Sequence, residues 1–305
     1  MRIVVTGGTG FIGRSLCQRL REEGHEVTVL ARDPHSAWSR LDRRITVIGW
    51  EGSGRLPEAA LGALGESDAI VNLAGAPVAA KRWTAKVKHR LQASREGATF
   101  ALVEALTTLR RRPAHLLNAS AIGYYGPRQD ELLTEDSLSG AGFLAGLCRA
   151  WEDAARAAEA LGICVTLLRI GVVLGRGGGA LSNMLPPFQV GLGGPMGRGS
   201  QWMSWIHLDD LVGLVLLLLT QPVAGPVNAT APHPVTNREF ARILGQVLRR
   251  PAFMPAPAFA LRLLLGEMAQ ELLLTGQRVL PRRAQQLGFR FHFPELGEAL
   301  RAALR

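Results

Sequence analysis

A glycine-rich segment near the N-terminus constrains the fold of this chain more than any other feature. It reads VTGGTGFIG, follows a β-branched run over Arg2–Thr6 and leads into a helical pattern over Phe11–Glu23. Glycine permits the positive φ of a tight turn and lets the backbone approach a pyrophosphate at the helix N-terminus. A strand, a glycine turn and a helix in this order predict a dinucleotide-binding βαβ unit; a tight turn without a ligand is the alternative.

The glycines of this segment fit two spacings. Gly8, Gly10 and Gly13 match GxGxxG, and the segment also matches GxxGxxG when it is read from Gly7. With either spacing, we expect the cofactor to contact the strand tip, the glycines and the first residues of the helix. These predicted contacts are Thr6, Gly7, Gly10, Phe11, Ile12 and Gly13.

The next strand, Glu26–Ala31, is followed by two charged residues that bear on the choice of cofactor. An NAD site normally has a carboxylate at this strand tip, whereas an arginine there pairs with the 2′-phosphate of NADP. Arg32 comes first and Asp33 second. We therefore predict that Arg32 contacts the cofactor and that the cofactor is NADP(H). The alternative is Asp33 turned toward a ribose 2′-hydroxyl.

The first half of the chain alternates short β-branched runs with helical stretches, which is typical of a parallel sheet covered by helices. Beyond the first helix, helices are expected over Ala85–Leu109, with a break, and over Phe143–Ala160. The predicted fold class is α/β, with a doubly wound parallel sheet of the Rossmann type. The expected strands are Arg2–Thr6, Glu26–Ala31, Ile45–Ile48, Asp68–Asn72, His115–Ala119 and Val165–Arg169.

The pattern changes in the second half of the chain. Gly175–Gly199 is rich in glycine and proline and predicts a long loop, a kind of segment that usually has a function. Asp209 or Asp210 is expected to cap a helix over Leu211–Leu219. A capping box that begins at Thr236 predicts another helix.

The composition narrows the range of partners. The chain has 305 residues and a net charge of +10, but no basic run with interleaved aromatic residues, so no nucleic-acid partner is expected. The three cysteines and scattered histidines fit no metal pattern. The longest apolar run is too short to cross a bilayer, and the N-terminal segment is typical of a strand rather than a signal peptide. We therefore expect a cytoplasmic protein with no membrane or metal partner.

Motifs beyond the glycine turn resemble the extended short-chain dehydrogenase/reductase superfamily. They narrow the resemblance to one atypical subgroup, the "epimerase family" or short-chain dehydrogenase family 39U, and they cover nearly the whole chain. The subgroup is named for homology to nucleotide-sugar epimerases, so its name is not evidence of that activity. The motifs include NLAGAPV at Asn72–Val78, ASAIGYYG at Ala119–Gly126, LRIGVVLGRGGGAL at Leu168–Leu181, GLGGPMGRGSQWMSWIHLDD at Gly191–Asp210 and GPVNATAPHPVTNREF at Gly225–Phe240.

The resemblance implies two domains around a cleft at the carboxyl ends of the strands. A Rossmann domain that binds NADP(H) covers residues 1–170 with about 205–230. A smaller C-terminal α/β domain, residues 171–204 with about 231–305, closes on a small-molecule substrate, and a homodimer is expected by analogy. Arg176 and Arg198 are candidates to hold an anionic substrate, with ordinary loop arginines as the alternative. The further cofactor contacts expected at the strand tips are Leu73, Ala74, Gly75, Ser120 and Arg169.

The usual catalytic residues of the superfamily are missing. The resemblance implies a tyrosine and, four residues later, a lysine on the helix that begins near Phe143. The only tyrosines are Tyr124 and Tyr125, and neither is followed by a lysine at that spacing. The candidate positions for the missing pair are Phe143 or Leu144, then Leu147 or Cys148.

Two classes of function remain. The first is an oxidoreductase or epimerase-like enzyme with a relocated proton donor. Tyr124 is the predicted donor, with Ser120 beside the superfamily's serine position, which falls on Ala121. Lys86 or Lys88 could supply a cation, with a solvated helix face as the alternative. The second class is a catalytically silent NADP(H)-binding sensor or scaffold, in which the glycine-rich loop would switch.

Overall fold

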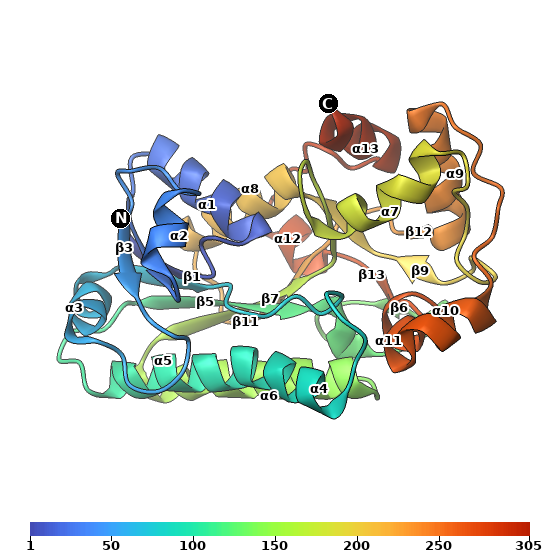
Figure 1. The fold of residues 1–305 in the computed structure, drawn as a ribbon. Coiled ribbons are helices and arrows are strands. Elements are labelled where there is room, and N and C mark those ends of the chain that lie inside the picture. The colour runs from blue at the N-terminus through green and yellow to red at the C-terminus, as the bar shows by residue number, and fades with distance from the viewer.

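The computed structural model describes all residues, 1–305, and is organised around a seven-stranded parallel sheet (Figure 1). The strand order is β11-β7-β5-β4-β1-β2-β3. The order reverses between β1 and β4, so the doubly wound Rossmann sheet is confirmed. The six expected strands form within two residues of their expected ends, and one edge strand was not anticipated. The strands are β1 (Arg2–Thr6), β2 (Glu26–Ala31), β3 (Thr46–Gly49), β4 (Ala69–Asn72), β5 (His115–Ala121), β7 (Cys164–Ile170) and β11 (Gly225–Ala229).

Helices cover both faces of this sheet, as Figure 1 shows. α1 (Phe11–Glu22) and α8 (Leu208–Thr220) pack together on one face. On the other face, α5 (Ala98–Thr107) packs against α3 (Glu58–Glu66) and α6 (Phe143–Arg156). Each face has its own hydrophobic core. The strands are apolar nearly throughout because both of their faces are buried.

The helix expected over Ala85–Leu109 is broken, as predicted. It consists of α4 (Ala85–Gln92), a π-helical turn η1 (Ala93–Gly97) and α5. Such π-helical turns inside a helix occur frequently at functional sites. The helix predicted from Phe143 likewise continues past α6 as a 3-10 turn, η3 (Ala157–Leu161).

The second half of the chain builds another hydrophobic core beside the sheet. It then returns to the first half of the chain. β13 (Arg278–Val279) pairs with β6 (Leu132–Leu133) outside the main sheet, and α12 (Arg282–Gln286) packs against the edge strand β11. The two predicted domains are therefore tied together by this returning segment. The remaining elements are α2 (Pro34–Trp38), η2 (Ile122–Tyr125), α7 (Gly179–Gln189), α9 (Asn237–Leu248), α10 (Ala258–Leu265), α11 (Glu267–Leu272), α13 (Leu296–Leu304), the pair β8 (Val172–Leu174) with β10 (Trp205–His207), and the pair β9 (Trp202–Met203) with β12 (Val235–Thr236).

The long loop expected over Gly175–Gly199 is wrong, because α7 lies inside it. The glycines on either side of α7 and its two internal prolines hide the helix in the sequence. Leu181 and Phe188 nevertheless pack into the second core, and this burial outweighs the poor helix propensity. The segment is thus an ordered part of the second core.

The cap expected for α8 is also wrong, since His207 takes that place. Its Nδ1 accepts a hydrogen bond from the Asp209 N–H at 3.2 Å. Asp210 is buried, and its carboxylate accepts from the N–H groups of His292 (2.7 Å) and Phe293 (3.0 Å) instead. The cap predicted at Thr236 is confirmed. No helix in the structure combines the length and the apolar character that a membrane crossing requires.

Candidate functional site

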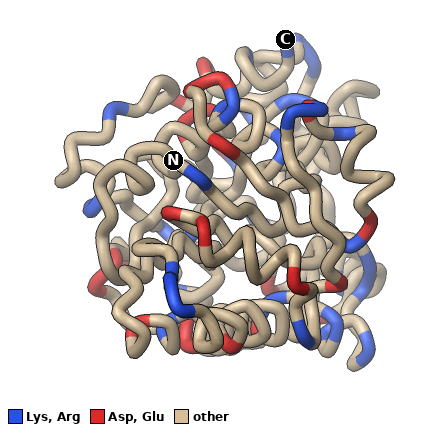
Figure 2. Tube along the Cα trace, turned by 90° about the vertical axis from the view of Figure 1, so that its left-hand side faces the viewer, with Lys and Arg blue, Asp and Glu red and all other residues tan.

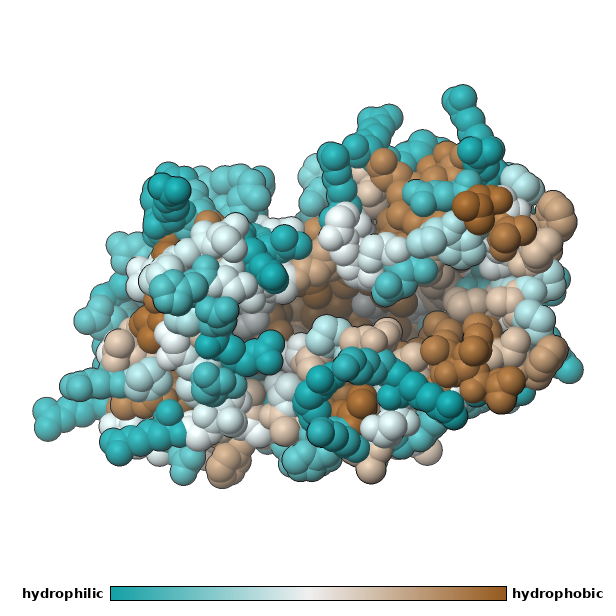
Figure 3. Space-filling model, in the orientation of Figure 1, coloured by the Kyte–Doolittle hydropathy of each residue, from teal (hydrophilic) through white to brown (hydrophobic).

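The carboxyl ends of β1, β4 and β5 point toward the region between the sheet and the second core. The space-filling view is hollowed near its centre, between the part that carries α1 and α2 and the part that carries α7, α10 and α11 (Figure 3). In open α/β sheets, ligands bind in the crevice outside the point where the strand order reverses. The strand order of this sheet reverses between β1 and β4, which makes the carboxyl ends of these two strands the expected ligand site.

The glycine turn at the end of β1 leaves no room for side chains. Gly7 has a φ of +70°, and a Cβ there would lie 2.5 Å from the carbonyl oxygen of Leu73. A Cβ on Gly13 would lie 2.2 Å from the carbonyl oxygen of Gly7. Gly10 is the N-cap of α1 and provides no side-chain cap, so the first N–H groups of this helix are open to an anion. Gly8 is crowded as well, because a Cβ there would lie 2.8 Å from the Val29 side chain, so the first position of either spacing requires glycine.

The other side chains predicted on this turn are engaged within the protein. Thr6 is buried, and its hydroxyl donates to Asn72 at 2.5 Å. The Phe11 ring fills the space beside Gly178, where a Cβ would lie 2.4 Å from a ring carbon, and Ile12 packs against the sheet core. A ligand at this turn would therefore meet backbone groups rather than these side chains.

At the tip of β2, the two charged residues have different surroundings. Asp33 caps α2, with its Oδ1 accepting from the N–H groups of His35 (3.0 Å) and Ser36 (3.2 Å). Arg32 is exposed, and its side chain makes no hydrogen bond or ion pair within the protein. Arg32 is thus the residue that is available to a ligand.

Other charges are spread around this side of the molecule. Figure 2 shows Lys and Arg interspersed with Asp and Glu on the side that carries α2 and β3. Near α2, for example, Arg44 pairs with Asp42 at 2.8 Å. The positive net charge is therefore not gathered into one continuous stripe on this face.

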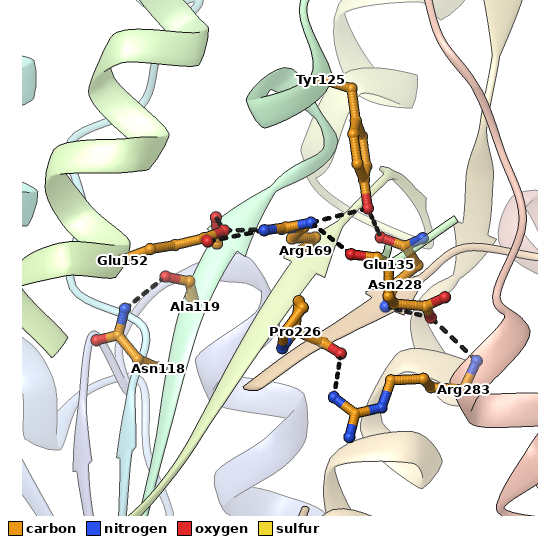
Figure 4. A network of polar contacts seen from close by, with 10 residues as sticks. Asn118, Ala119, Tyr125, Glu135, Glu152, Arg169, Pro226, Asn228 and Arg283 are labelled. Carbon is orange, nitrogen blue, oxygen red and sulfur yellow. Dashed lines mark hydrogen bonds and ion pairs between the residues drawn. The ribbon is translucent and has the colours of Figure 1, made fainter. Parts of the chain in front are cut away.

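A buried ion pair lies at the ends of β7 and α6 (Figure 4). Nε and Nη2 of Arg169 donate to the two carboxylate oxygens of Glu152, each at 2.9 Å, and both side chains are at most 3% exposed. Burial alone would lower the pKa of Arg169, but the hydrogen bonds and charge of Glu152 outweigh it and raise that pKa. Ser120 Oγ donates to the same carboxylate at 2.7 Å.

The polar cluster continues toward β11 through Tyr125 and Asn228 (Figure 4). Arg169 Nη1 donates to the Tyr125 hydroxyl at 3.0 Å, and this hydroxyl donates to Asn228 Oδ1 at 2.7 Å. Burial raises the pKa of Tyr125 to about 12, although the guanidinium opposes it. Glu135 Oε1 accepts from the N–H groups of Asn228 (3.0 Å) and Arg283 (3.1 Å). One cluster thus joins α6, β7, β11 and α12.

This cluster changes the roles expected for two residues. The sequence predicts that Arg169 contacts the cofactor, but four of its five N–H groups donate to Glu152, Tyr125 and the Glu135 carbonyl oxygen. Ser120, predicted as a cofactor or catalytic contact, is buried and donates to Glu152. Both side chains therefore support the site from within the protein. An arginine inside the apolar strand CVTLLRI is the signal that could have predicted this, because a buried charge requires a partner.

Tyr124 is held by the same cluster but has a free hydroxyl. The guanidinium carbon of Arg169 lies 3.5 Å from the centroid of its ring, and the Tyr125 ring meets it edge-on at 5.4 Å. Tyr124 is half-buried, and its hydroxyl makes no hydrogen bond within the protein. A ring fixed on one side by a cation, with an unused hydroxyl, is suited to proton donation.

Known proteins match this chain over nearly its whole length. Residues 3–231 match the model of the NAD dependent epimerase/dehydratase family. The chain belongs to this family. Residues 256–303 match a domain of unknown function, DUF1731. The resemblance to extended short-chain dehydrogenases and to their epimerase-family subgroup is therefore confirmed.

Three relatives illustrate the match. The Arabidopsis thaliana epimerase family protein SDR39U1 homolog, chloroplastic, is 44% identical over 311 residues, which cover 100% of this chain and 87% of the relative. The crystal structure of human epimerase family protein SDR39U1 (isoform 2) with NADPH has a TM-score of 0.87 and 37% identity over 99% of each chain. UDP-glucuronic acid 4-epimerase from Bacillus cereus has a TM-score of 0.78 at 18% identity over 99% of this chain and 94% of its own, and shares the fold.

Among the candidate positions for the missing pair in this epimerase-family chain, Leu144 and Cys148 have the same neighbour. Both lie against η2, since a Cβ on Gly123 would be 3.2 Å from Leu144 Cβ and 3.9 Å from Cys148 Sγ. Phe143 instead meets the Trp83 ring edge-on, at 5.0 Å. Leu147 belongs to the hydrophobic cluster around Trp83. The side chains nearest to the Cβ position of Gly123 are thus Leu144 and Cys148, whereas Phe143 and Leu147 contact the cluster around Trp83.

No acid–base group or lysine replaces the pair at these positions. Burial, assisted by the charge of Glu152, raises the pKa of Cys148 to about 11, so this thiol stays protonated near neutral pH. Lys88 is engaged by Glu267 at 2.5 Å, and Lys86 is exposed on α4. The solvated-face alternative therefore fits Lys86, and an ion pair accounts for Lys88.

A glutamate from the C-terminal part caps the helix that carries these positions. Glu271 of α11 accepts from the N–H groups of Phe143 and Leu144, each at 2.8 Å. Gly142, at φ +107°, lets the carboxylate approach, because a Cβ there would lie 3.0 Å from Glu271 Oε1. Sequence reasoning missed this cap since capping signals are local and these residues are 127 or more positions apart.

Proposed function

We propose that this protein binds NADP(H) and uses it in an oxidoreductase or epimerase-like reaction on a small molecule. The tip of β2 carries the proposal, because Asp33 is held by its own helix and Arg32 is free. A free arginine pairs with a 2′-phosphate, whereas Asp33 would have to leave its cap to accept from a 2′-hydroxyl. NADPH in the human relative supports the same choice of cofactor.

The residues present fit a dinucleotide. The Gly7–Gly13 turn and the open N-terminus of α1 would hold the pyrophosphate, and Arg32 would hold the 2′-phosphate. Leu73 and Ala74, half-buried after β4, would border the adjoining ribose. When bound, the nicotinamide would supply or take up a hydride, and the chain would orient it and provide the proton.

Tyr124 is the proton donor in this proposal. Its hydroxyl is unused, and Arg169 fixes its ring while Glu152 holds Arg169 in place. An anionic substrate would find exposed arginines in the segments around α7, of which Arg176 and Arg198 are candidates. This arrangement explains how an enzyme of the family could work with Leu144 and Cys148 at the usual catalytic positions.

The cofactor choice is tested by fluorescence titration of the purified protein with NADPH and with NADH. The wild type should prefer NADPH by about tenfold to a hundredfold, the value of one charge-assisted contact. Arg32→Asp should erase this preference because it removes the cation and adds a carboxylate. Arg43→Asp, an exposed residue with no side-chain partner, is the control and should keep the preference. An unchanged preference in Arg32→Asp would remove Arg32 from the site.

The lack of a tyrosine followed four residues later by a lysine favours a second candidate, the catalytically silent NADP(H)-binding sensor. The two functions are distinguished by the rate of NADPH oxidation when the protein is mixed with a low-molecular-mass cell extract. In the Gly13→Ala variant, the added Cβ would clash with the glycine turn and prevent cofactor binding. NADPH oxidation by the wild type that is absent in this variant would support the enzyme. A persistently inert holoprotein that gains a protein partner only with NADPH would support the sensor.

A further inference from the structure

Arg95 is a cation beside the segment after β4 that neither the sequence motifs nor the network around Arg169 accounts for. It lies in the π-helical turn η1, where the helix expected over residues 85–109 is interrupted. Its Nη2 donates to the Ala76 carbonyl oxygen at 3.0 Å, and its Nη1 donates to the Leu91 carbonyl oxygen at 3.2 Å. A guanidinium has five N–H groups, so three remain for another acceptor.

No carboxylate balances this cation. The nearest acidic residue along the chain, Glu96, accepts a hydrogen bond from Gln92 instead. The guanidinium lies 5.2 Å from the centroid of the Trp151 ring and is half-buried, and burial lowers the pKa of Arg95. An unpaired and partly desolvated charge is costly to keep, which is typical of a side chain that meets a ligand.

The place of Arg95 follows from the glycines beside β4. Leu73 touches the glycine turn through its carbonyl oxygen, beside Gly7. Two residues on, a Cβ on Gly75 would lie 3.1 Å from the guanidinium carbon of Arg95. The Arg95 guanidinium therefore fills the space that a side chain at position 75 would take, and a ligand beside Gly75 would meet this guanidinium. The segment after β4 thus has the glycine turn on one side and Arg95 on the other.

This order of sites fixes which half of a dinucleotide Arg95 would meet. Along the sheet edge the strand order is β2, β1, β4, β5. A cofactor with its 2′-phosphate at Arg32, on β2, and its pyrophosphate at the turn after β1 would extend over β4 toward β5. Arg95 lies over the end of β4, and its charge is close enough to Cys148 on α6 to act on it. The adenosine half would lie on the other side of the glycine turn.

We propose that Arg95 binds the nicotinamide half of NADP(H), donating to oxygen atoms of the nicotinamide ribose from beside Gly75. The inference rests on the proposed NADP(H) function and deepens it. In this proposal, the cation that the usual lysine would provide on α6 comes instead from Arg95, in the π-helical turn between α4 and α5. Leu144 and Cys148 on α6 then do not have to provide a charge.

Affinities for two ligands distinguish contacts to the nicotinamide half of the cofactor from contacts to the adenosine half. NADPH contains both halves, and adenosine 2′,5′-bisphosphate contains only the adenosine half with its 2′-phosphate. Arg95→Gln should weaken NADPH binding by about tenfold to a hundredfold, the value of hydrogen bonds from a charged donor, and should leave the bisphosphate affinity unchanged. Arg32→Gln should weaken both ligands. Arg90→Gln, an exposed residue one turn earlier on α4 with no side-chain partner, should weaken neither.

The outcomes distinguish the inference from the proposed function. If Arg95→Gln binds NADPH like the wild type, or loses both ligands in parallel, Arg95 does not bind the nicotinamide half. Arg95→Lys, which keeps the charge but not the forked donors, separates a loss of fold from a loss of contact: partial recovery of NADPH affinity supports the contact. If the wild type binds neither ligand, the proposed function itself is overturned, and the inference with it.

Discussion

Replacing Glu152 with alanine is expected to lower the free energy of unfolding by about 3–5 kcal/mol, since it leaves the Arg169 guanidinium buried without its carboxylate. The same change removes the acceptor of the Ser120 hydroxyl. Urea denaturation of the purified protein measures the effect, with the slope checked for two-state behaviour.

Two further variants make this result specific to the ion pair. Asp153→Ala changes the next residue on α6, which is exposed and has no side-chain partner, and should alter stability by no more than about 0.5 kcal/mol. A double variant, Glu152→Leu with Arg169→Met, should recover part of the loss because no unpaired charge remains. A loss below about 1 kcal/mol in Glu152→Ala would show that the pair contributes little.

The second large effect concerns Tyr124. Tyr124→Phe should reduce turnover by about a hundredfold or more, the range for loss of a general acid, while NADPH affinity stays within about twofold. The rate of NADPH oxidation with one extract preparation measures the ratio between variant and wild type, so the substrate need not be identified. The ring and its contact with Arg169 remain in place in this variant.

Tyr125→Phe is the matched control, because it removes a hydroxyl from the neighbouring ring. That hydroxyl joins Arg169 to Asn228, so its loss should lower the free energy of unfolding by about 1–3 kcal/mol. Turnover should fall less than in Tyr124→Phe. Equal turnover in Tyr124→Phe and the wild type would exclude Tyr124 as the donor, and a larger loss in Tyr125→Phe would place the chemistry elsewhere in the cluster.

Local signals predicted the strand, the glycine turn and the helix near the N-terminus. The glycine turn was visible in the sequence because its backbone needs glycine at positions that neighbours in the chain define, Gly7 to Gly13. The apolar strand pattern likewise predicted the parallel sheet and its doubly wound class. Arg32 and Asp33 were recognised together, but only the structure shows that Asp33 is used as a helix cap.

Distant contacts explain what the sequence analysis missed. Glu152 and Arg169 pair across two elements, and Arg95 reaches Gly75 from a separate helix, so no short motif announces either one. The helix α7 was hidden by its prolines and glycines, and the α8 cap passed to His207 because Asp210 serves two N–H groups of the C-terminal segment. In each case, a contact with a residue far along the chain determined the local structure or the role of the side chain.

The cap that Glu271 forms on α6 is expected to make the folding of α6 depend on a segment that is synthesised after the main sheet. During synthesis, all seven strands of the main sheet emerge before α11 and α12 do. Contacts between distant parts of a chain form late, so the end of α6 and the outer edge at β11 would stay uncovered on the ribosome. A nascent chain that ends after β11 is therefore expected to be cleaved readily by proteases, although it already contains the complete glycine turn. Emergence of the segment that carries α11 and α12 would be the step that covers the end of α6 and the edge at β11.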